Sequence, residues 1–177
     1  MTKTLKELNH ILEDISPNQW DSIPDIDLYI DQVLDYMKRQ HPGLNLNESL
    51  TSSMVNNYAK QGLIPRSKGK KYNREHIACL TIICLLKQIT SVADTKLLLQ
   101  DILKESDYQS LYEDYIQLFD DEATMLRDFI SDKAENSTTN SDIHKVIIKM
   151  AITSYLYKFA CQYLITNLEK EDGANEK

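Results

Sequence analysis

Hydrophobic residues recur every three or four positions along most of the chain, which is the spacing of one helix face. The first such pattern lies between Thr4 and Ile15 and is ended by Ser16 and Pro17. Further patterns of helical length cover residues 25–40, 51–61, 73–89, 91–103, 106–134 and 142–169. Only 4 Gly and 4 Pro occur in 177 residues, too few for the turns of a many-stranded sheet. The pattern therefore predicts an all-α protein.

The pattern at 25–40 predicts a helix that begins directly after Pro24. Its apolar stripe is Ile26, Ile30, Val33, Leu34 and Met37. Asp25 and Asp27 then fall in the first turn and Lys38 and Arg39 in the last, where their charges favour the helix dipole. The run His41-Pro42-Gly43 stops the helix.

One small sheet is expected within this helical chain. Lys68-Gly69-Lys70 has the composition of a tight turn. Residues 64–65 and 71–73 could pair across it as a two-stranded ribbon, or wing. The helix that follows the wing is nearly all apolar from Ile77 to Leu86. We therefore expect it to be the buried centre of this part of the chain.

Two helix ends carry recognisable local chemistry. Gly62 follows the pattern at 51–61 and precedes Pro65, which predicts a glycine-terminated helix. Ser91 and Asp94 have the spacing of a capping box, in which each side chain bonds the other residue's backbone amide.

Charge is distributed unevenly along the chain. The net charge is −7, but the segment from Lys38 to Thr90 contains nine basic and two acidic residues. Five of these basic residues gather in or beside the wing: Arg66, Lys68, Lys70, Lys71 and Arg74. A cluster of this density can contact several phosphates of a nucleic acid, although a solvated basic loop has the same composition.

The helix predicted at 51–61 divides into two arcs at 100° per residue. Its polar arc contains no carboxylate and consists of Ser52, Ser53, Asn56, Asn57 and Lys60. The opposite arc consists of Met54, Val55, Tyr58 and Ala59 and can pack on the long apolar helix. Asn, Ser and Lys can bond base edges or phosphates, so the polar arc is a candidate for the DNA major groove.

A family resemblance accompanies this pattern. The run from Leu50 to Pro65, the basic turn and the segment from Tyr72 to Ile77 resemble the winged helix-turn-helix of the MerR family of bacterial regulators. The whole chain is also similar to a family of uncharacterised bacterial proteins that are predicted to be MerR-like. The resemblance implies a transcriptional regulator that binds double-stranded DNA as a homodimer. It adds Tyr58 and Tyr72 to the candidate DNA-binding residues, which already include Arg74 of the basic cluster.

These observations divide the chain into four parts. Residues 1–24 form an N-terminal helix and linker, 25–104 the DNA-binding module, 105–170 a helical dimerisation or effector region, and 171–177 a disordered tail. The helix at 106–134 could form the dimer seam, covered by the helix that starts at Asp142 after a polar linker at 136–141. An unidentified small-molecule effector could bind among the tyrosines of this region, which are Tyr108, Tyr112, Tyr115, Tyr155, Tyr157 and Tyr163.

Other classes of chemistry find little support in the sequence. No phosphate-binding loop, zinc spacing or nucleophile motif occurs, so neither an enzyme nor a cofactor is expected. Cys79, Cys84 and Cys161 are predicted to be reduced and buried, in a cytoplasmic protein without a membrane span. The main alternative is a helical protein–protein interaction module that does not bind DNA. A small-molecule-binding helical protein or enzyme is the weakest of the three hypotheses.

Overall fold

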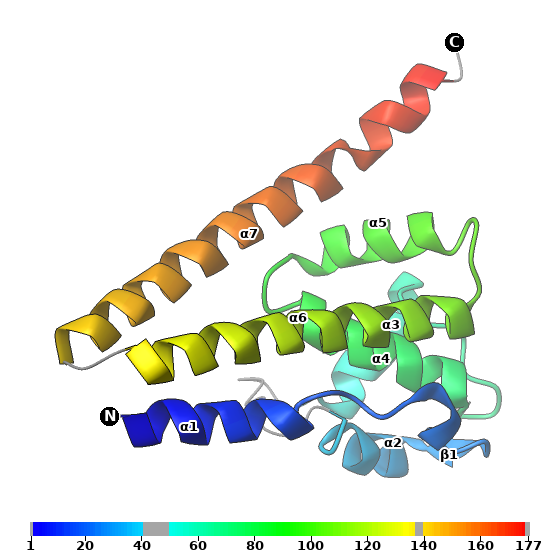
Figure 1. Cartoon of the computed structure of the whole chain (residues 1–177). Helices are drawn as coiled ribbons and strands as arrows, with labels where there is room; N and C mark the ends of the chain where they lie inside the picture. Colours follow the sequence, from blue (N-terminus) through cyan, green and yellow to red (C-terminus); the bar gives the residue numbers. More distant parts are fainter. Residues whose placement is uncertain (1, 41–49, 137–139, 176–177) are drawn as a thin grey trace.

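The computed structural model describes residues 2–40, 50–136 and 140–175, and most of them are helical (Figure 1). The α-helices are α1 (Thr2–Ile11), α2 (Ile30–Met37), α3 (Ser52–Gln61), α4 (Arg74–Leu86), α5 (Val92–Ile102), α6 (Tyr108–Asn136) and α7 (Asn140–Asn175). Two 3-10 helices, η1 (Leu12–Asp14) and η2 (Trp20–Ser22), and two strands, β1 (Leu28–Tyr29) and β2 (Lys71–Tyr72), complete the described elements. The predicted mostly helical fold with one small sheet is confirmed.

The first hydrophobic core forms around α4. Every residue from His76 to Cys84 is buried, which confirms the predicted central helix. Elements on all sides contribute to this core, among them α2 through Val33, α3 through Val55 and α6 through Tyr112. The predicted capping box of α5 is also present, since Ser91 Oγ accepts from the Asp94 amide at 3.1 Å.

The small sheet is present, but its pairing was predicted wrongly. Strand β2 pairs antiparallel with β1, with Leu28 opposite Tyr72 and Tyr29 opposite Lys71. Residues 64–65 do not form the partner strand, because Ile64 is buried in the first core and Pro65 has no amide proton to donate. The sheet therefore joins the wing to the segment before α2.

Helix α2 begins later than predicted because β1 occupies its expected first turn. Tyr29 is the residue before the helix, and its amide donates to Gln32 Oε1 at 2.9 Å. Asp31, not Asp25 or Asp27, is the acidic residue of the first turn. Ile26 lies outside the helix and is 67% exposed. The helix also ends earlier than predicted, at Met37, so Lys38 and Arg39 follow its last turn. The predicted stop signal at 41–43 lies outside the described residues.

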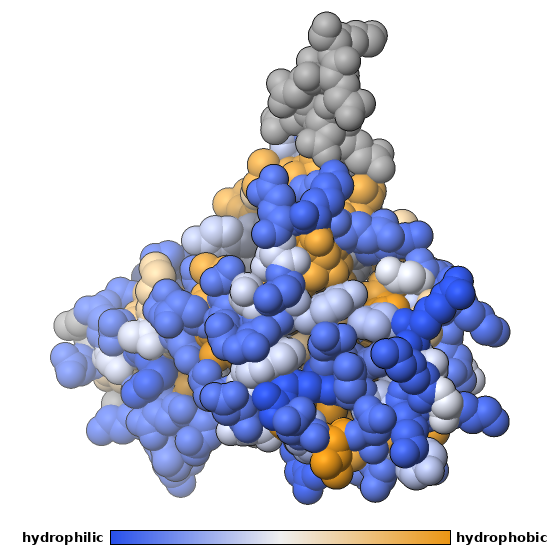
Figure 2. Space-filling view, turned by 90° about the vertical axis from the view of Figure 1, so that its right-hand side faces the viewer, coloured by the Kyte–Doolittle hydropathy of each residue, from blue (hydrophilic) through white to orange (hydrophobic). Residues whose placement is uncertain are grey.

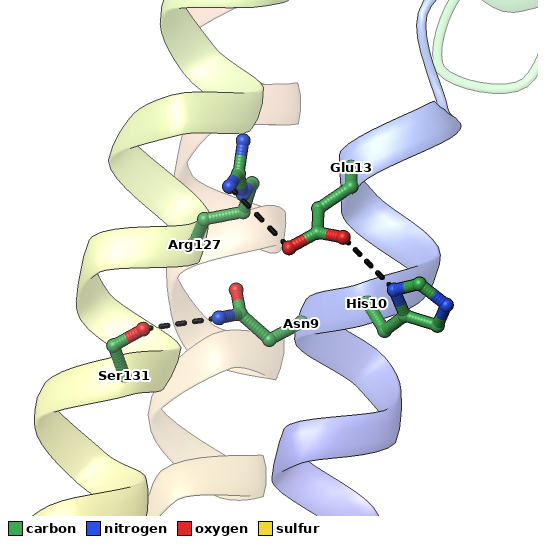
Figure 3. A network of polar contacts seen from close by, with 5 residues as sticks. All are labelled: Asn9, His10, Glu13, Arg127 and Ser131. Carbon is green, nitrogen blue, oxygen red and sulfur yellow. Dashed lines mark hydrogen bonds and ion pairs between the residues drawn. The ribbon is translucent and has the colours of Figure 1, made fainter.

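A second core joins the two ends of the chain. Leu5 and Leu12 from the N-terminal region pack with Ile130 of α6, and side chains of α7 lie against them. Polar contacts flank this α1–α6 contact (Figure 3). Arg127 Nη2 lies 3.7 Å from Glu13 Oε1, and Asn9 Nδ2 donates to Ser131 Oγ at 3.1 Å.

Helix α6 contributes to both cores, because Leu111, Tyr112 and Ile116 belong to the first and Ile130 to the second. Neither core is complete without α6. The boundary expected at 104/105 therefore does not separate two independently packed units, and the N-terminal helix packs with the C-terminal region.

Helix α7 leads away from the body of the molecule (Figure 1). It begins against the second core and contacts α5 further along. Helix α7 continues through Asn175, so residues 171–175 are helical, whereas composition predicted a disordered tail. The helix can extend this far because Glu169, Lys170 and Glu171 are residue types that favour helix. The predicted linker lies partly outside the described residues, at 137–139. Within the described segments, each helix is too short or too polar to cross a membrane.

Candidate nucleic-acid interface

Helix α3 has the ends that local chemistry predicts. Before its first residue, Thr51 Oγ1 accepts from the Met54 amide at 3.2 Å. After its last residue, Gly62 adopts the left-handed conformation, with φ 74°, that is easiest for glycine. These two residues fix the start and the end of a ten-residue helix. The prediction for 51–61 is confirmed within one residue.

The two arcs of α3 are also confirmed. Val55 and Tyr58 are buried in the first core, and Met54 and Ala59 pack against it. On the opposite side Ser53, Asn56, Asn57 and Lys60 are exposed, and Ser52 is half-buried. The solvent-facing arc thus presents hydroxyl, carboxamide and ammonium groups without a carboxylate. These groups can donate to base edges and phosphates.

We keep the name wing for residues 66–71, which contain the tight turn that the sequence predicts. The Lys71 amide donates to the Lys68 carbonyl at 3.1 Å. Gly69 and Lys70 have φ 60° and 62°, the positive values that both central residues of a type I′ hairpin turn adopt. A lysine in this conformation is disfavoured by about 1–2 kcal/mol, because its Cβ approaches the following carbonyl. The turn therefore holds the Lys70 side chain at the tip of the wing despite a conformational cost.

The positive charges of α3 and the wing are not neutralised by ion pairs within the described chain. Lys60, Arg66, Lys68 and Lys70 are exposed, and none of them forms an ion pair with a residue that the structure describes. Lys71 is half-buried, and its Nζ lies 5.6 Å from the centre of the Tyr29 ring. Uncompensated surface charges of this kind remain available to phosphates.

Three of the predicted DNA-binding residues have other roles. Tyr58 and Tyr72 are each only 3% exposed, because their rings complete the first core. Both assignments to DNA contact are therefore wrong, and the packing of Tyr58 follows the helical period instead. Arg74 has a side chain 19% exposed, stacked 5.4 Å from the Trp20 ring centre and 3.8 Å from Asp21 Oδ1. It links the start of α4 to η2 and does not belong to the wing.

The sheet brings acidic residues close to the base of the basic wing, although they lie more than forty positions before β2 along the chain. Asp25 and Asp27 line a shallow polar pocket together with Asn73, Arg74 and Glu75. All of these residues flank either β1 or the start of α4. The basic surface is therefore bordered by carboxylates at the base of the wing. The position of Asp25 and Asp27 beside the wing follows from the β1–β2 pairing, which no local sequence pattern indicates.

His76 lies buried at the same end of α4. Its Nδ1 accepts from the Asn73 amide at 3.1 Å, and its own amide donates to Asn73 Oδ1 at 3.3 Å. The Tyr72 ring meets the imidazole edge to face at 5.3 Å. Burial lowers the pKa of His76 below its ordinary value, because the charged imidazolium loses its hydration. The neutral ring therefore helps to hold the base of the wing.

The tyrosines proposed for an effector pocket do not converge on one. Tyr112 is buried in the first core, Tyr108 and Tyr115 pack against that core, and Tyr155 and Tyr163 face solvent. An apolar groove of about 540 Å³ does lie between η1, the end of α4, α6 and α7. Of the six tyrosines only Tyr157 lines this groove. The prediction of a tyrosine-lined pocket is wrong because helix periodicity directs these rings to different faces.

The cysteines differ in their exposure. Cys79 and Cys84 are buried in α4, where loss of hydration raises the pKa of the thiols to about 12 and about 11. Cys161 on α7 is only half-buried, so the expectation of burial is confirmed for two of the three. Among the residues with described positions, no three His, Cys, Asp or Glu side chains cluster as metal ligands would.

The first core and its wing thus form a helical domain with a two-stranded sheet at one edge and a capped, half-exposed helix, α3. A family model matches residues 18–121, more than half of the chain, so the protein belongs to the family described as Domain of unknown function (DUF1836). The matched region includes the whole first core, from Trp20 to Ile116, and omits α1 and α7. No curated protein and no solved structure matches the chain.

Proposed function

We propose that this protein is a sequence-specific DNA-binding transcriptional regulator in which α3 enters the major groove and the wing contacts the backbone. The observation that carries the proposal is the exposed arc of α3, which has amide, hydroxyl and ammonium groups and no carboxylate. An ordinary exposed helix face mixes acidic with basic residues, whereas this arc lacks the groups that a phosphate backbone would repel. The MerR-like arrangement expected from the sequence has the same two elements in the same order.

The two elements have different tasks in this proposal. Asn56 and Asn57 can each form paired hydrogen bonds with the major-groove edge of adenine. Lys60, Arg66, Lys68 and Lys70 neutralise phosphates, which supplies affinity without sequence preference. One copy of α3 offers too few contacts for tight specific binding, so the proposal includes two copies on two half-sites.

Fluorescence anisotropy with the DNA upstream of the protein's own coding region tests the proposal. Wild-type affinity should fall steeply as salt increases, because bound phosphates release counterions. Asn56→Ala and Asn57→Ala should each reduce the preference for specific over random DNA by about 1–3 kcal/mol. Alanine favours helix, so these changes should leave α3 folded.

A wing variant separates charge from turn geometry. Lys70→Asn removes the charge but keeps a residue that tolerates positive φ, so the turn should remain. It should weaken specific and random DNA equally and reduce the salt dependence by about one phosphate contact. Lys6→Gln on α1, outside the module, is the control and should change neither. Binding that ignores both salt and these variants would refute the proposal.

The second candidate is a protein–protein interaction module without DNA binding. Exposed apolar residues on α7, among them Tyr155, Phe159 and Leu164, favour it. Affinity purification from the source cells with and without nuclease distinguishes the two functions. Loss of associated material after nuclease treatment favours DNA binding. Retention of a protein partner, together with no DNA affinity in vitro, favours the alternative.

A further inference from the structure

Helix α7 carries large apolar residues on two opposite faces. The inner stripe packs toward the chain itself and consists of Ile143, Val146, Met150, Cys161 and Ile165. The outer stripe consists of Ile148, Ile152, Tyr155, Leu156, Phe159 and Tyr163, which are 55% to 69% exposed. Ile147, Tyr157 and Leu164 are exposed to a similar extent but lie outside this stripe on the helix. At 100° per residue the outer stripe is centred opposite the inner one. A helix that is apolar on both faces is normally buried on both.

Contacts at both ends fix the rotation of α7 about its own axis. Near its start, Val146 is 7% exposed, and Met150 packs on the second core. Further along, Ile165 is 3% exposed, and Gln162 Nε2 donates to the Ile89 carbonyl at 2.8 Å. The outer stripe therefore faces away from the body. Figure 2 shows hydrophobic surface gathered at the top of the molecule, directly below the grey atoms, where α7 leaves the body.

The outer stripe has the size of one side of a stable interface. Its six residues expose on the order of 800 Å² together, which is what one partner contributes to a standard protein interface. Lys145 and Lys149 border the stripe beside Ile148 and Ile152, whereas Phe159 and Tyr163 stack with ring centres 6.5 Å apart. Single exposed apolar residues are ordinary on protein surfaces, but a continuous patch of this area indicates a binding face.

The order of residues in the outer stripe is symmetric about its midpoint. The midpoint lies between Tyr155 and Leu156. Each position before it has a counterpart at the same distance after it: 155 corresponds to 156, 152 to 159 and 148 to 163. Two antiparallel copies of α7 related by a two-fold axis at this point would therefore pair every member. Ile148 would meet the partner's Tyr163, Ile152 the partner's Phe159, and Tyr155 the partner's Leu156. The contact would be about 22 Å long at 1.5 Å per residue.

We propose that a second copy of this chain covers the outer stripe, forming a homodimer through antiparallel pairing of the two α7 helices. The predicted seam on the helix at 106–134 is then not the main interface, since α6 already packs against α1 and α4. Because each body lies on the inner side of its own α7, the two bodies stand on opposite sides of the helix pair. The dimer would provide the two-fold symmetry used in the proposed DNA binding, but its evidence comes from α7 alone.

Light scattering on the full-length protein without DNA tests the oligomeric state. The wild type should have twice the chain mass of 20.5 kDa at micromolar concentration. Ile152→Glu should be monomeric, with dimer affinity reduced about 100-fold or more, because each copy would bury an unpaired carboxylate. Leu118→Glu on α6 is the matched control: Leu118 is 65% exposed and outside the stripe, so this variant should remain dimeric. A monomeric wild type, or a dimeric Ile152→Glu, overturns the proposal.

Cysteine pairs test the antiparallel register in a Cys161→Ser background, where Cys79 and Cys84 stay buried. Under mild oxidation, a mixture of Ile148→Cys and Tyr163→Cys chains should form mixed disulfides. Ile148→Cys alone should not cross-link, because its two copies would lie about 22 Å apart. Cross-linking of Ile148→Cys alone indicates parallel helices and overturns the register.

A vesicle assay distinguishes the other occupant that an apolar, aromatic stripe could have. A monomeric wild type that binds phosphatidylcholine–phosphatidylglycerol vesicles, and loses that binding in Ile152→Glu, would assign the stripe to a lipid surface instead. All of these assays omit DNA. A dimer that fails to bind DNA would refute the proposed function and leave the pairing intact. A chain that is monomeric without DNA but binds two half-sites as two copies would refute the pairing and leave the proposed function intact.

Discussion

Helices α4 and α7 both contain many large apolar residues, yet these residues have opposite surroundings. In α4 every residue from His76 to Cys84 is buried. In α7 nine large apolar residues between Ile147 and Leu164 are at least 55% exposed. The difference lies in their neighbours, since α4 has α2, β2 and α6 around it, whereas α7 contacts the body mainly near its ends.

This comparison indicates that α4 contributes to the free energy of folding, whereas the outer stripe of α7 contributes to the free energy of association. Burial of α4 takes place when one chain folds, so its apolar residues stabilise the monomer. The outer stripe of α7 remains in water in the monomer, so its apolar residues can contribute only to association. Substitutions in the two helices should therefore separate folding from assembly.

The largest effect on folding is expected in α4. Leu80→Ala should lower the free energy of unfolding by about 2–5 kcal/mol, because Leu80 is fully buried and its removal leaves a cavity. Ile152→Ala in α7 should change the unfolding free energy of the monomer by less than about 0.5 kcal/mol. Urea denaturation monitored by circular dichroism, at a concentration below dimerisation, measures both. Similar losses for the two variants would show that α7 is buried within the monomer.

An intermediate effect is expected where α6 joins the first core. The buried Tyr112 hydroxyl donates to the Asn18 carbonyl at 2.7 Å and accepts from Gln40 Nε2 at 2.9 Å. Tyr112→Phe removes both bonds inside the core and should lower the free energy of unfolding by about 1–3 kcal/mol. Tyr155→Phe on the exposed face of α7 is the control and should have almost no effect. The same urea denaturation measures both variants. Equal changes in the free energy of unfolding would show that the Tyr112 hydrogen bonds do not stabilise the first core.

The smallest effect is a pH dependence at the base of the wing. Burial holds the pKa of His76 below 6.5, its value in the unfolded chain, so protons bind more tightly to the unfolded state. The contribution of His76 is complete above pH 6.5 and is lost as pH falls toward its folded pKa, by at most about 1.4 kcal/mol per pH unit. Unfolding of wild type and His76→Gln between pH 7.5 and 5 should therefore show a shallower slope in the variant.

The exposed His144 provides the control for this pH dependence. His144→Gln should keep the wild-type slope between pH 7.5 and 5. An unchanged slope in His76→Gln would mean that the buried imidazole does not control stability in this range. The comparison uses slopes because the loss of the Asn73–His76 bonds also lowers stability at every pH.

Much of the local structure could be predicted because its causes lie within a few residues. Thr51 and Gly62 fix the ends of α3, and the helical period assigns Val55 and Tyr58 to its buried arc. The Ser91–Asp94 box is likewise a three-residue interaction. The MerR-like resemblance placed Tyr58 and Tyr72 on the DNA side, but the packing of their rings in the first core contradicts that assignment.

Features that depend on distant segments could not be predicted in this way. Strand β2 pairs with β1, more than forty positions earlier, and this pairing delays α2 and brings Asp25 and Asp27 beside the wing. Arg74 belongs to the basic cluster in sequence, yet it stacks on Trp20. No local pattern identifies either contact.

The sequence by itself determined the helical class, the bounds and two faces of α3, the tight turn at the tip of the wing and the buried position of α4. Each of these follows from residue spacing or from a cap within one turn of helix. Only the tertiary structure decided the partner of β2, the sharing of α6 between two cores and the exposure of the outer stripe of α7. The hydrophobic effect drives apolar surface out of water without specifying which surface covers it, so the identity of the neighbour appears only when the whole chain is folded.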